Sequence, residues 1–97
     1  MAARMELDPD TRVRLRGDRV TWKLAGDEVI ALQLPSYEYL AARDSGAEVW
    51  QRLTEPVTPA ELAAWLSEHY GIDADRARSD VGAFLEQLCE RDLLELA

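Results

Sequence analysis

The side chains that perform covalent or metal chemistry in proteins are sparse in this sequence. It contains one histidine, His69, and one cysteine, Cys89. A catalytic nucleophile needs a base beside it, and a zinc site needs several His or Cys ligands. The five glycines are scattered along the chain and form no phosphate-binding loop. The sequence therefore predicts a protein that is not an enzyme and that holds no metal ion and no cofactor.

Backbone hydrogen bonding is a second kind of chemistry, and residues 28–34 are suited to it. This segment, EVIALQL, is largely apolar and carries no charge from Val29 to Leu34. If it is the last strand of a small sheet, it is an uncharged edge to which another strand can add. The sequence leaves two interpretations open: a loop or helix of the same chain covers this edge, or a second chain pairs with it.

The segments ahead of this strand predict a β-meander. Apolar and polar residues alternate over 11–16 and again over 19–24, which is typical of half-buried strands. Gly17-Asp18 between them is a two-residue hairpin turn. Pairing across this turn places the apolar residues of both strands on one face, with Leu15 opposite Val20. The first strand is then one edge of the meander, and residues 28–34 are the other.

The register of the third strand depends on the length of the turn before it. A three-residue loop would place Ile30, Leu32 and Leu34 on the inner face of the sheet. A two-residue loop would place Val29, Ala31 and Gln33 there instead. We favour the first register because it buries more apolar surface. Pro35 ends the strand.

The second half of the chain predicts three helices. Asp44 or Ser45 caps the first, and residues 58–61, TPAE, form a capping box with proline at the first position of the second. Asp73 caps a third helix that runs to about Arg91, and its apolar stripe consists of Ala77, Val81, Phe84, Leu85 and Leu88. A three-stranded antiparallel meander followed by three helices is an α+β fold of the winged helix-turn-helix type.

Length and charge limit the class of protein further. Ninety-seven residues form one domain, residues 1–97, in which residues 1–10 are expected to be a flexible tail. The net charge is −8, and the acidic third helix would repel DNA phosphates. A single cysteine allows no internal disulfide, and no segment is apolar enough for a signal peptide or a membrane span. We expect a cytoplasmic protein that binds neither nucleic acid nor membrane.

Several short motifs occur in a characteristic order. Tyr39 is followed by SGAEVWQRL at 45–53, then by VTPAEL at 57–62, and last by DV, FL and LL between residues 80 and 94. Together they resemble the PqqD-like family, the peptide-recognition elements of ribosomally synthesised peptide natural products. The chain departs from the family pattern at four positions: Tyr37 and Asp92 stand where Gly is common, Ala42 where Leu is common, and Arg43 where Asn is common.

The resemblance implies a non-catalytic protein that binds the leader region of a precursor peptide. The leader would add as an antiparallel strand to the third strand and fill a groove between that strand and the third helix. The implied binding residues are Val29, Ile30, Ala31, Leu32, Gln33 and Leu34 of the strand, and Arg76, Ala77, Asp80, Ala83, Phe84 and Gln87 of the helix. Phe84 either lines this groove or belongs wholly to the core.

The resemblance also indicates partners. A free-standing chain of this size is most similar to the discrete leader-binding proteins of lasso peptide biosynthesis, which work with a separate leader peptidase. The implied partners are therefore the precursor peptide and a leader peptidase or another maturation enzyme, and the protein is a monomer or a homodimer. The alternatives are a peptide chaperone for a radical SAM enzyme, as in PQQ biosynthesis, an accessory subunit that only stabilises an enzyme, and a winged-helix DNA-binding regulator.

Overall fold

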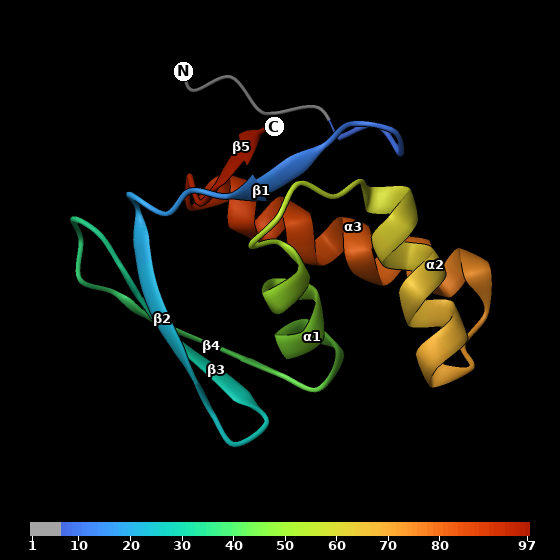
Figure 1. Ribbon diagram of the computed structural model, residues 1–97, viewed down its shortest axis with the longest axis horizontal. Helices are drawn as coiled ribbons and strands as arrows, with labels where there is room; N and C mark the ends of the chain where they lie inside the picture. The colour runs from blue at the N-terminus through green and yellow to red at the C-terminus, as the bar shows by residue number, and fades with distance from the viewer. Residues whose placement is uncertain (1–6) are drawn as a thin grey trace.

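Residues 7–97 are described by the computed structural model, and they form two small antiparallel sheets and a layer of three helices (Figure 1). The strands are β1 (Val13–Leu15), β2 (Val20–Ala25), β3 (Glu28–Gln33), β4 (Tyr39–Arg43) and β5 (Leu94–Leu96). The helices are α1 (Ser45–Arg52), α2 (Pro59–Tyr70) and α3 (Ala74–Glu90). An antiparallel meander followed by three helices confirms the predicted α+β class.

The meander consists of β2, β3 and β4, and β3 lies in its centre. Along its whole length β4 pairs antiparallel with β3, from Leu32 opposite Tyr39 to Glu28 opposite Arg43. The prediction that residues 28–34 form a free edge is therefore wrong. Within the described residues, the two open edges of this sheet belong to β2 and β4.

The first strand belongs to a different sheet from the one predicted. Instead of forming a hairpin with β2, β1 pairs with β5, and Leu15 lies opposite Leu94. The other side of β1 is also occupied, because Val13 N–H donates to the Val57 carbonyl at 2.9 Å and Leu15 N–H to the Leu53 carbonyl at 2.8 Å. With both sides of β1 occupied by later parts of the chain, no edge remains for β2.

The turn between β2 and β3 has two residues, so the register of β3 is the alternative that places Val29 and Ala31 on the inner face. Gly26 and Asp27 form a two-residue hairpin loop between Ala25 and Glu28, and Gly26 has φ 68°, a conformation that suits glycine. Val29 and Ala31 are consequently buried, at 0% and 1% exposure. The layer between the sheet and the helices already contains the rings of Trp22 and Trp50, which meet edge to face with centroids 6.2 Å apart. The small side chain of Ala31 fits on this face of the sheet beside them.

The second helix begins as the sequence predicts. The Thr58 hydroxyl accepts a hydrogen bond from Glu61 N–H, and the Glu61 carboxylate accepts one from Thr58 N–H, both at 3.1 Å. Pro59 occupies the first turn, and Gly71 ends the helix with φ 63°. The hydrogen bonds with Thr58 lower the pKa of Glu61 below its ordinary value. The hydrogen bond with the Thr58 backbone has the larger effect, and the one with the Thr58 side chain has the smaller.

This lowered pKa predicts a pH dependence of stability. A carboxylate whose pKa is lower in the folded state stabilises that state above its unfolded pKa, and the contribution disappears as the pH falls through the folded pKa. We therefore expect the free energy of unfolding to fall more steeply for the wild type than for Glu61→Gln as the pH is lowered from about 6 to about 3. Urea denaturation at several pH values in this range measures the free energy of unfolding of both proteins. Parallel pH profiles for the wild type and Glu61→Gln would contradict the prediction.

Two positions that depart from the family pattern have the backbone conformation that glycine favours. Tyr37, in the turn between β3 and β4, has φ 61°, and Asp92, after α3, has φ 58°. Asp92 is also held by Arg16, whose guanidinium donates to its carboxylate at 3.0 Å. Tyr37 has an exposed side chain, so its left-handed conformation is the simpler one to test.

Replacing Tyr37 by glycine should give a more stable protein than replacing it by alanine. A left-handed residue with a Cβ costs about 1–2 kcal/mol, and the greater freedom of unfolded glycine offsets about 0.5–1 kcal/mol of the gain. We expect a net difference of about 0.5–1 kcal/mol in chemical denaturation. The matched pair at the neighbouring Ser36, which lacks a positive φ, should show the opposite order. Alanine as stable as glycine at position 37 would contradict the prediction.

The expected N-terminal tail is partly attached to the fold. Residues 1–6 of it lie outside the described part of the chain. Leu7 packs against the hydrophobic core, and the Pro9 carbonyl accepts a hydrogen bond from Ala60 N–H at 3.1 Å. Pro9 therefore joins this segment to the start of α2. None of the helices in the described range is long and apolar enough to cross a membrane.

Candidate functional site

A cavity of about 310 Å³ lies between the open edge of β4 and helix α3. We call it the β4–α3 groove. The sheet contributes Val29 and Ala31 of β3 and residues 39–42 of β4, and the helical side contributes Trp50, Phe84, Gln87, Leu88 and Arg91. Most of these side chains are apolar, but the exposed wall of the cavity is more polar than apolar, so the groove suits an extended segment that brings both backbone polar groups and apolar side chains.

Helix periodicity places the residues of α3 in this groove. Phe84, Gln87 and Leu88 lie three and four positions apart, so they share one flank of the helix. The Phe84 ring lies beside Gly46 at the start of α1: a Cβ at Gly46 would be 3.4 Å from Phe84 Cε1, an ordinary contact distance. Phe84 packs against the core while it also lines the groove, so it does not belong wholly to the core.

Among residues 7–97, no strand pairs with β4 on the side that borders the groove. Gln33 N–H donates to the Glu38 carbonyl at 2.8 Å, and this bond fixes which residues of the antiparallel ladder are hydrogen-bonded. By the alternation of such ladders, the N–H and C=O groups of Tyr39, Ala41 and Arg43 point away from β3. These groups are the donors and acceptors available to an added strand.

Polar groups stand at the two ends of the groove. At one end, Arg91 Nη1 lies 3.5 Å from the Glu38 carboxylate, and Gln33 Nε2 donates to the Arg91 carbonyl at 3.0 Å. At the other end, Arg43 donates to the Glu28 carboxylate, and this hydrogen bond raises the pKa of Arg43 above its ordinary value. The groove thus has charged groups near both of its ends.

The structure brings together four of the predicted site residues: Val29, Ala31, Phe84 and Gln87 all line the groove. Gln33 borders it through its bond to Arg91. Ile30 and Leu32 alternate with these residues and therefore lie on the opposite face of the sheet. Leu34 lies beyond the end of β3 and donates its N–H to the Arg19 carbonyl at 2.8 Å.

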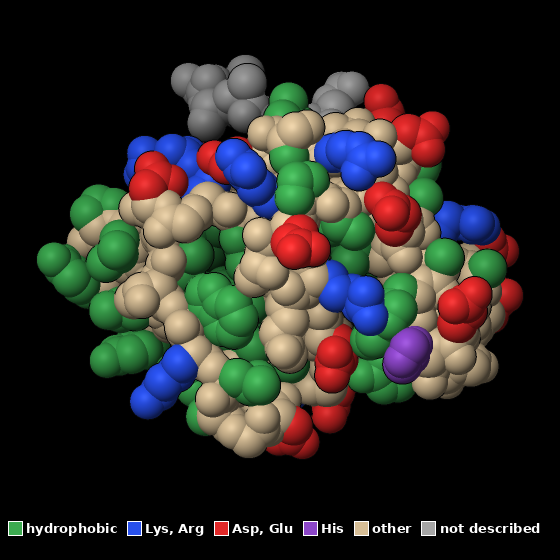
Figure 2. Space-filling model, in the orientation of Figure 1, with side chains coloured by type: hydrophobic (Ala, Val, Ile, Leu, Met, Phe, Trp, Pro, Cys, Tyr) green, Lys and Arg blue, Asp and Glu red, His purple; other side chains and the backbone are tan. Residues whose placement is uncertain are grey.

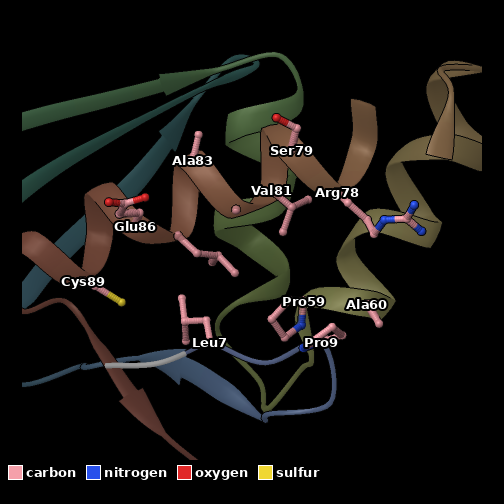
Figure 3. A pocket seen from close by; sticks show the side chains of 12 residues that line it. Leu7, Pro9, Pro59, Ala60, Arg78, Ser79, Val81, Ala83, Glu86 and Cys89 are labelled. Atoms are coloured by element: carbon pink, nitrogen blue, oxygen red, sulfur yellow. The ribbon is translucent and has the colours of Figure 1, made fainter. Parts of the chain in front are cut away.

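The remaining predicted residues of α3 lie elsewhere. Arg76 and Asp80 face each other across one helical turn at 3.9 Å on an exposed surface, and Ala77 is fully buried in the core. Ala83 lines a separate cavity of about 700 Å³ on the other flank of α3, where Figure 3 shows it with Leu7 and other residues around the start of α2. These residues do not line the β4–α3 groove.

Sequence reasoning missed β4 as a pairing strand and missed Leu88 and Arg91 as groove residues. Trp50 entered the prediction only as part of the motif at 45–53. The sequence of β4 gives no clear strand signal, because Tyr39, Leu40 and Ala41 are consecutive apolar residues without alternation and the segment lacks the β-branched residues typical of strands.

The face of the sheet that points away from the helices is apolar over β3 and β4, while Thr21 and Lys23 of β2 lie on the same face. By strand alternation it carries Ile30, Leu32, Tyr39 and Ala41, which we call the outer-face patch. Tyr39 is 78% exposed. Figure 2 shows hydrophobic side chains exposed along the left side of the molecule, where the sheet lies. Contiguous exposed apolar surface of this kind is typical of protein contact sites.

The fold and the groove define a class of protein: a small winged-helix-like module whose open strand edge and adjoining groove can take up an extended segment. No group of three His, Cys, Asp or Glu side chains able to hold a metal ion occurs in residues 7–97. The family model described as Coenzyme PQQ synthesis protein D (PqqD) matches residues 28–94. The chain therefore belongs to this family.

Two solved structures are similar to the whole fold. One is TbiB1 in complex with the TbiA(beta) leader peptide, with 28% identity and a TM-score of 0.78, covering 84% of this chain and 94% of that one. The other is a lasso peptide synthetase B1 complexed with the leader peptide, with 26% identity and a TM-score of 0.75, covering 86% of this chain and 96% of that one. No curated protein matches the chain.

Proposed function

We propose that this protein binds the leader region of a ribosomally synthesised precursor peptide and catalyses no reaction itself. The open edge of β4 beside the β4–α3 groove carries this proposal. The two similar structures are complexes with leader peptides, which supports the same function here. Because β4 covers β3, the leader would add to β4 and not to residues 28–34.

The geometry of strand addition suggests how the leader is held. An antiparallel leader strand would exchange backbone hydrogen bonds with Tyr39, Ala41 and Arg43, whose polar groups face outward. Its side chains would alternate between the groove and the outer face of the sheet. One side chain would enter the cavity between Ala31 and Phe84 and act as the main anchor. Backbone bonds then supply register, and the cavity supplies specificity.

The partner enzyme would dock on the sheet. A leader bound at β4 widens the sheet by one strand and adds its own side chains beside the outer-face patch. We propose that a leader peptidase of the lasso peptide type, or another maturation enzyme, contacts this enlarged apolar surface in the cytoplasm. Holding the leader there raises the local concentration of the precursor at the enzyme.

Calorimetric titration with the leader segment of a precursor peptide encoded beside this protein tests the proposal. We expect saturable one-to-one binding with a negative change in heat capacity, because apolar surface is buried. A control peptide of the same composition and scrambled order should not bind. Absence of binding to a folded, monomeric protein would overturn the proposal and favour an accessory subunit.

A peptide chaperone for a radical SAM enzyme is the second candidate, favoured by the description of the matching family. It uses the same groove and differs in the enzyme that the protein accompanies. Affinity capture of leader-bound protein with a purified peptidase and with a purified radical SAM enzyme separates the two. Retention of the radical SAM enzyme alone would support the second candidate.

A further inference from the structure

Three side chains link the end of α3 to the sheet at one end of the β4–α3 groove. Gln33, the last residue of β3, donates from Nε2 to the Arg91 carbonyl at 3.0 Å, and Arg91 Nη1 donates to Gln33 Oε1 at 3.4 Å. The same Nη1 lies 3.5 Å from the Glu38 carboxylate. Arg91 is the C-cap of α3, so Gln33 also satisfies a carbonyl that has no acceptor role within the helix.

Gln33 is the more important of the two side chains that hold Arg91. The Arg91 and Glu38 side chains are 41% and 62% exposed, so water screens their attraction and the ion pair contributes little. Gln33 is partly buried and contacts both the backbone and the guanidinium of Arg91. These two contacts from one planar amide restrain the direction of the Arg91 side chain as well as its place.

The position of Arg91 lies on the path of a strand added to β4. Arg91 lines the groove together with Tyr39, the first residue of β4. The N–H and C=O groups of Tyr39 point away from β3, so an added strand that pairs with them passes Arg91. Both sheet-side acceptors are bonded to Nη1, and the guanidinium carries further N–H donors on Nε and Nη2. These donors suit a carbonyl oxygen of the added strand.

We infer that Arg91 donates to a backbone carbonyl of the bound leader at this end of the groove, and that Gln33 is the positioning residue that holds Arg91 for this contact. The inference rests on the proposed function and adds to it a contact that does not depend on leader sequence, because every residue has a backbone carbonyl. Gln33 acts through Arg91 and not by touching the leader itself.

A matched pair of variants at position 33 separates this role from a general contribution to stability. Gln33→Met keeps the length of the side chain but loses both bonds, whereas Gln33→Glu keeps the acceptor for the Arg91 guanidinium and loses the donor to its carbonyl. In calorimetric titration with a synthetic leader segment, Gln33→Met should bind about three- to tenfold more weakly than the wild type, and Gln33→Glu within about twofold of it. Equal affinity of Gln33→Met and the wild type, or equal losses in both variants, overturns the inference.

A bond of the same kind outside the groove controls for stability. Ser67 Oγ donates to the Ile72 carbonyl at 2.7 Å beyond the end of α2. Ser67→Ala should lower the free energy of unfolding in urea denaturation, as Gln33→Met does, but it should leave leader affinity unchanged. A loss of affinity in Ser67→Ala equal to that in Gln33→Met would assign the effect to stability and overturn the inference.

A double-mutant cycle tests whether Gln33 acts through Arg91. Arg91→Ala should weaken leader binding at least as much as Gln33→Met, and the double variant should bind no more weakly than Arg91→Ala alone. Additive losses would show that Gln33 acts independently and would overturn the positioning role.

Leader peptides in which each residue in turn is replaced by alanine test the contact with the backbone. The ratio of wild-type to Gln33→Met affinity should be the same for all of them, because each keeps its carbonyls. A ratio that falls to one for a single replacement would show that Arg91 binds a side chain, which overturns the inference. If the leader binds the wild type and Gln33→Met equally, the inference fails alone; if it does not bind the wild type, the proposed function fails as well.

Discussion

The variant Ala41→Pro should lose leader binding by about a hundredfold or more while remaining folded. The Ala41 N–H points away from β3, so proline removes no bond from the existing ladder, and proline is tolerated on edge strands. It does remove a donor for the added strand, and its ring occupies the space that the strand would fill. Calorimetry measures the affinity, and circular dichroism checks the fold.

The other open edge of the same sheet provides a matched control. Leu34 N–H donates to the Arg19 carbonyl, and alternation from this pair directs the Leu24 N–H out of the sheet at the edge of β2. Leu24→Pro therefore makes the same chemical change at an edge that does not border the groove. It should leave leader binding unchanged. Loss of binding in Leu24→Pro, with Ala41→Pro unaffected, would place the leader on β2.

Local sequence signals predicted the helices well because helix ends are determined by neighbouring residues. Thr58 and Glu61 form both hydrogen bonds of the capping box, and Gly71 adopts the left-handed conformation that ends α2. The positive φ values of Tyr37 and Asp92 show why glycine is common there in related sequences. Each of these features depends on a few adjacent residues.

Strand pairing was less predictable because its determinants are distant in the sequence. The turn signal at Gly17-Asp18 is real, since the chain does turn there, but β1 finds its partner in β5 at the other end of the chain. The segment that became β4 contains two alanines and few residues with strand preference. Its pairing with β3 changed which edge is open, and no local pattern indicated that change.

Four of the predicted site residues line the groove even though the pairing of β4 with β3 was missed, and the reason is geometric. Val29 and Ala31 face the helices in the observed register, and the groove beside β4 lies over the same inner face of the sheet. Phe84 and Gln87 lie on the flank of α3 that faces it. With the proposed binding strand at β4 and not β3, these four residues still line the groove beside it, while Ile30 and Leu32 are members of the outer-face patch and not the expected backbone partners.

The position of Leu32 on the outer face of the sheet predicts a variant in which leader binding and delivery of the precursor to the enzyme are separated. Leu32→Asp places a charge in the outer-face patch without altering the groove, because Leu32 and Ala31 point to opposite faces of β3. Leader affinity should be unchanged, while the rate at which the partner peptidase cleaves the precursor should fall about tenfold or more, since desolvating a charge opposes docking. Calorimetry measures the first quantity and a cleavage assay the second.

The matched charge at Ser79, an exposed position of α3 that lies outside the groove and the outer-face patch, controls for net charge. Ser79→Asp should leave both affinity and cleavage at wild-type values. Unchanged cleavage with Leu32→Asp would show that the enzyme does not dock on the outer face, whereas equal losses in both variants would indicate a general effect of charge. Selective loss in Leu32→Asp would show that one thin sheet serves two partners, with the leader along its β4 edge and the enzyme on its outer face.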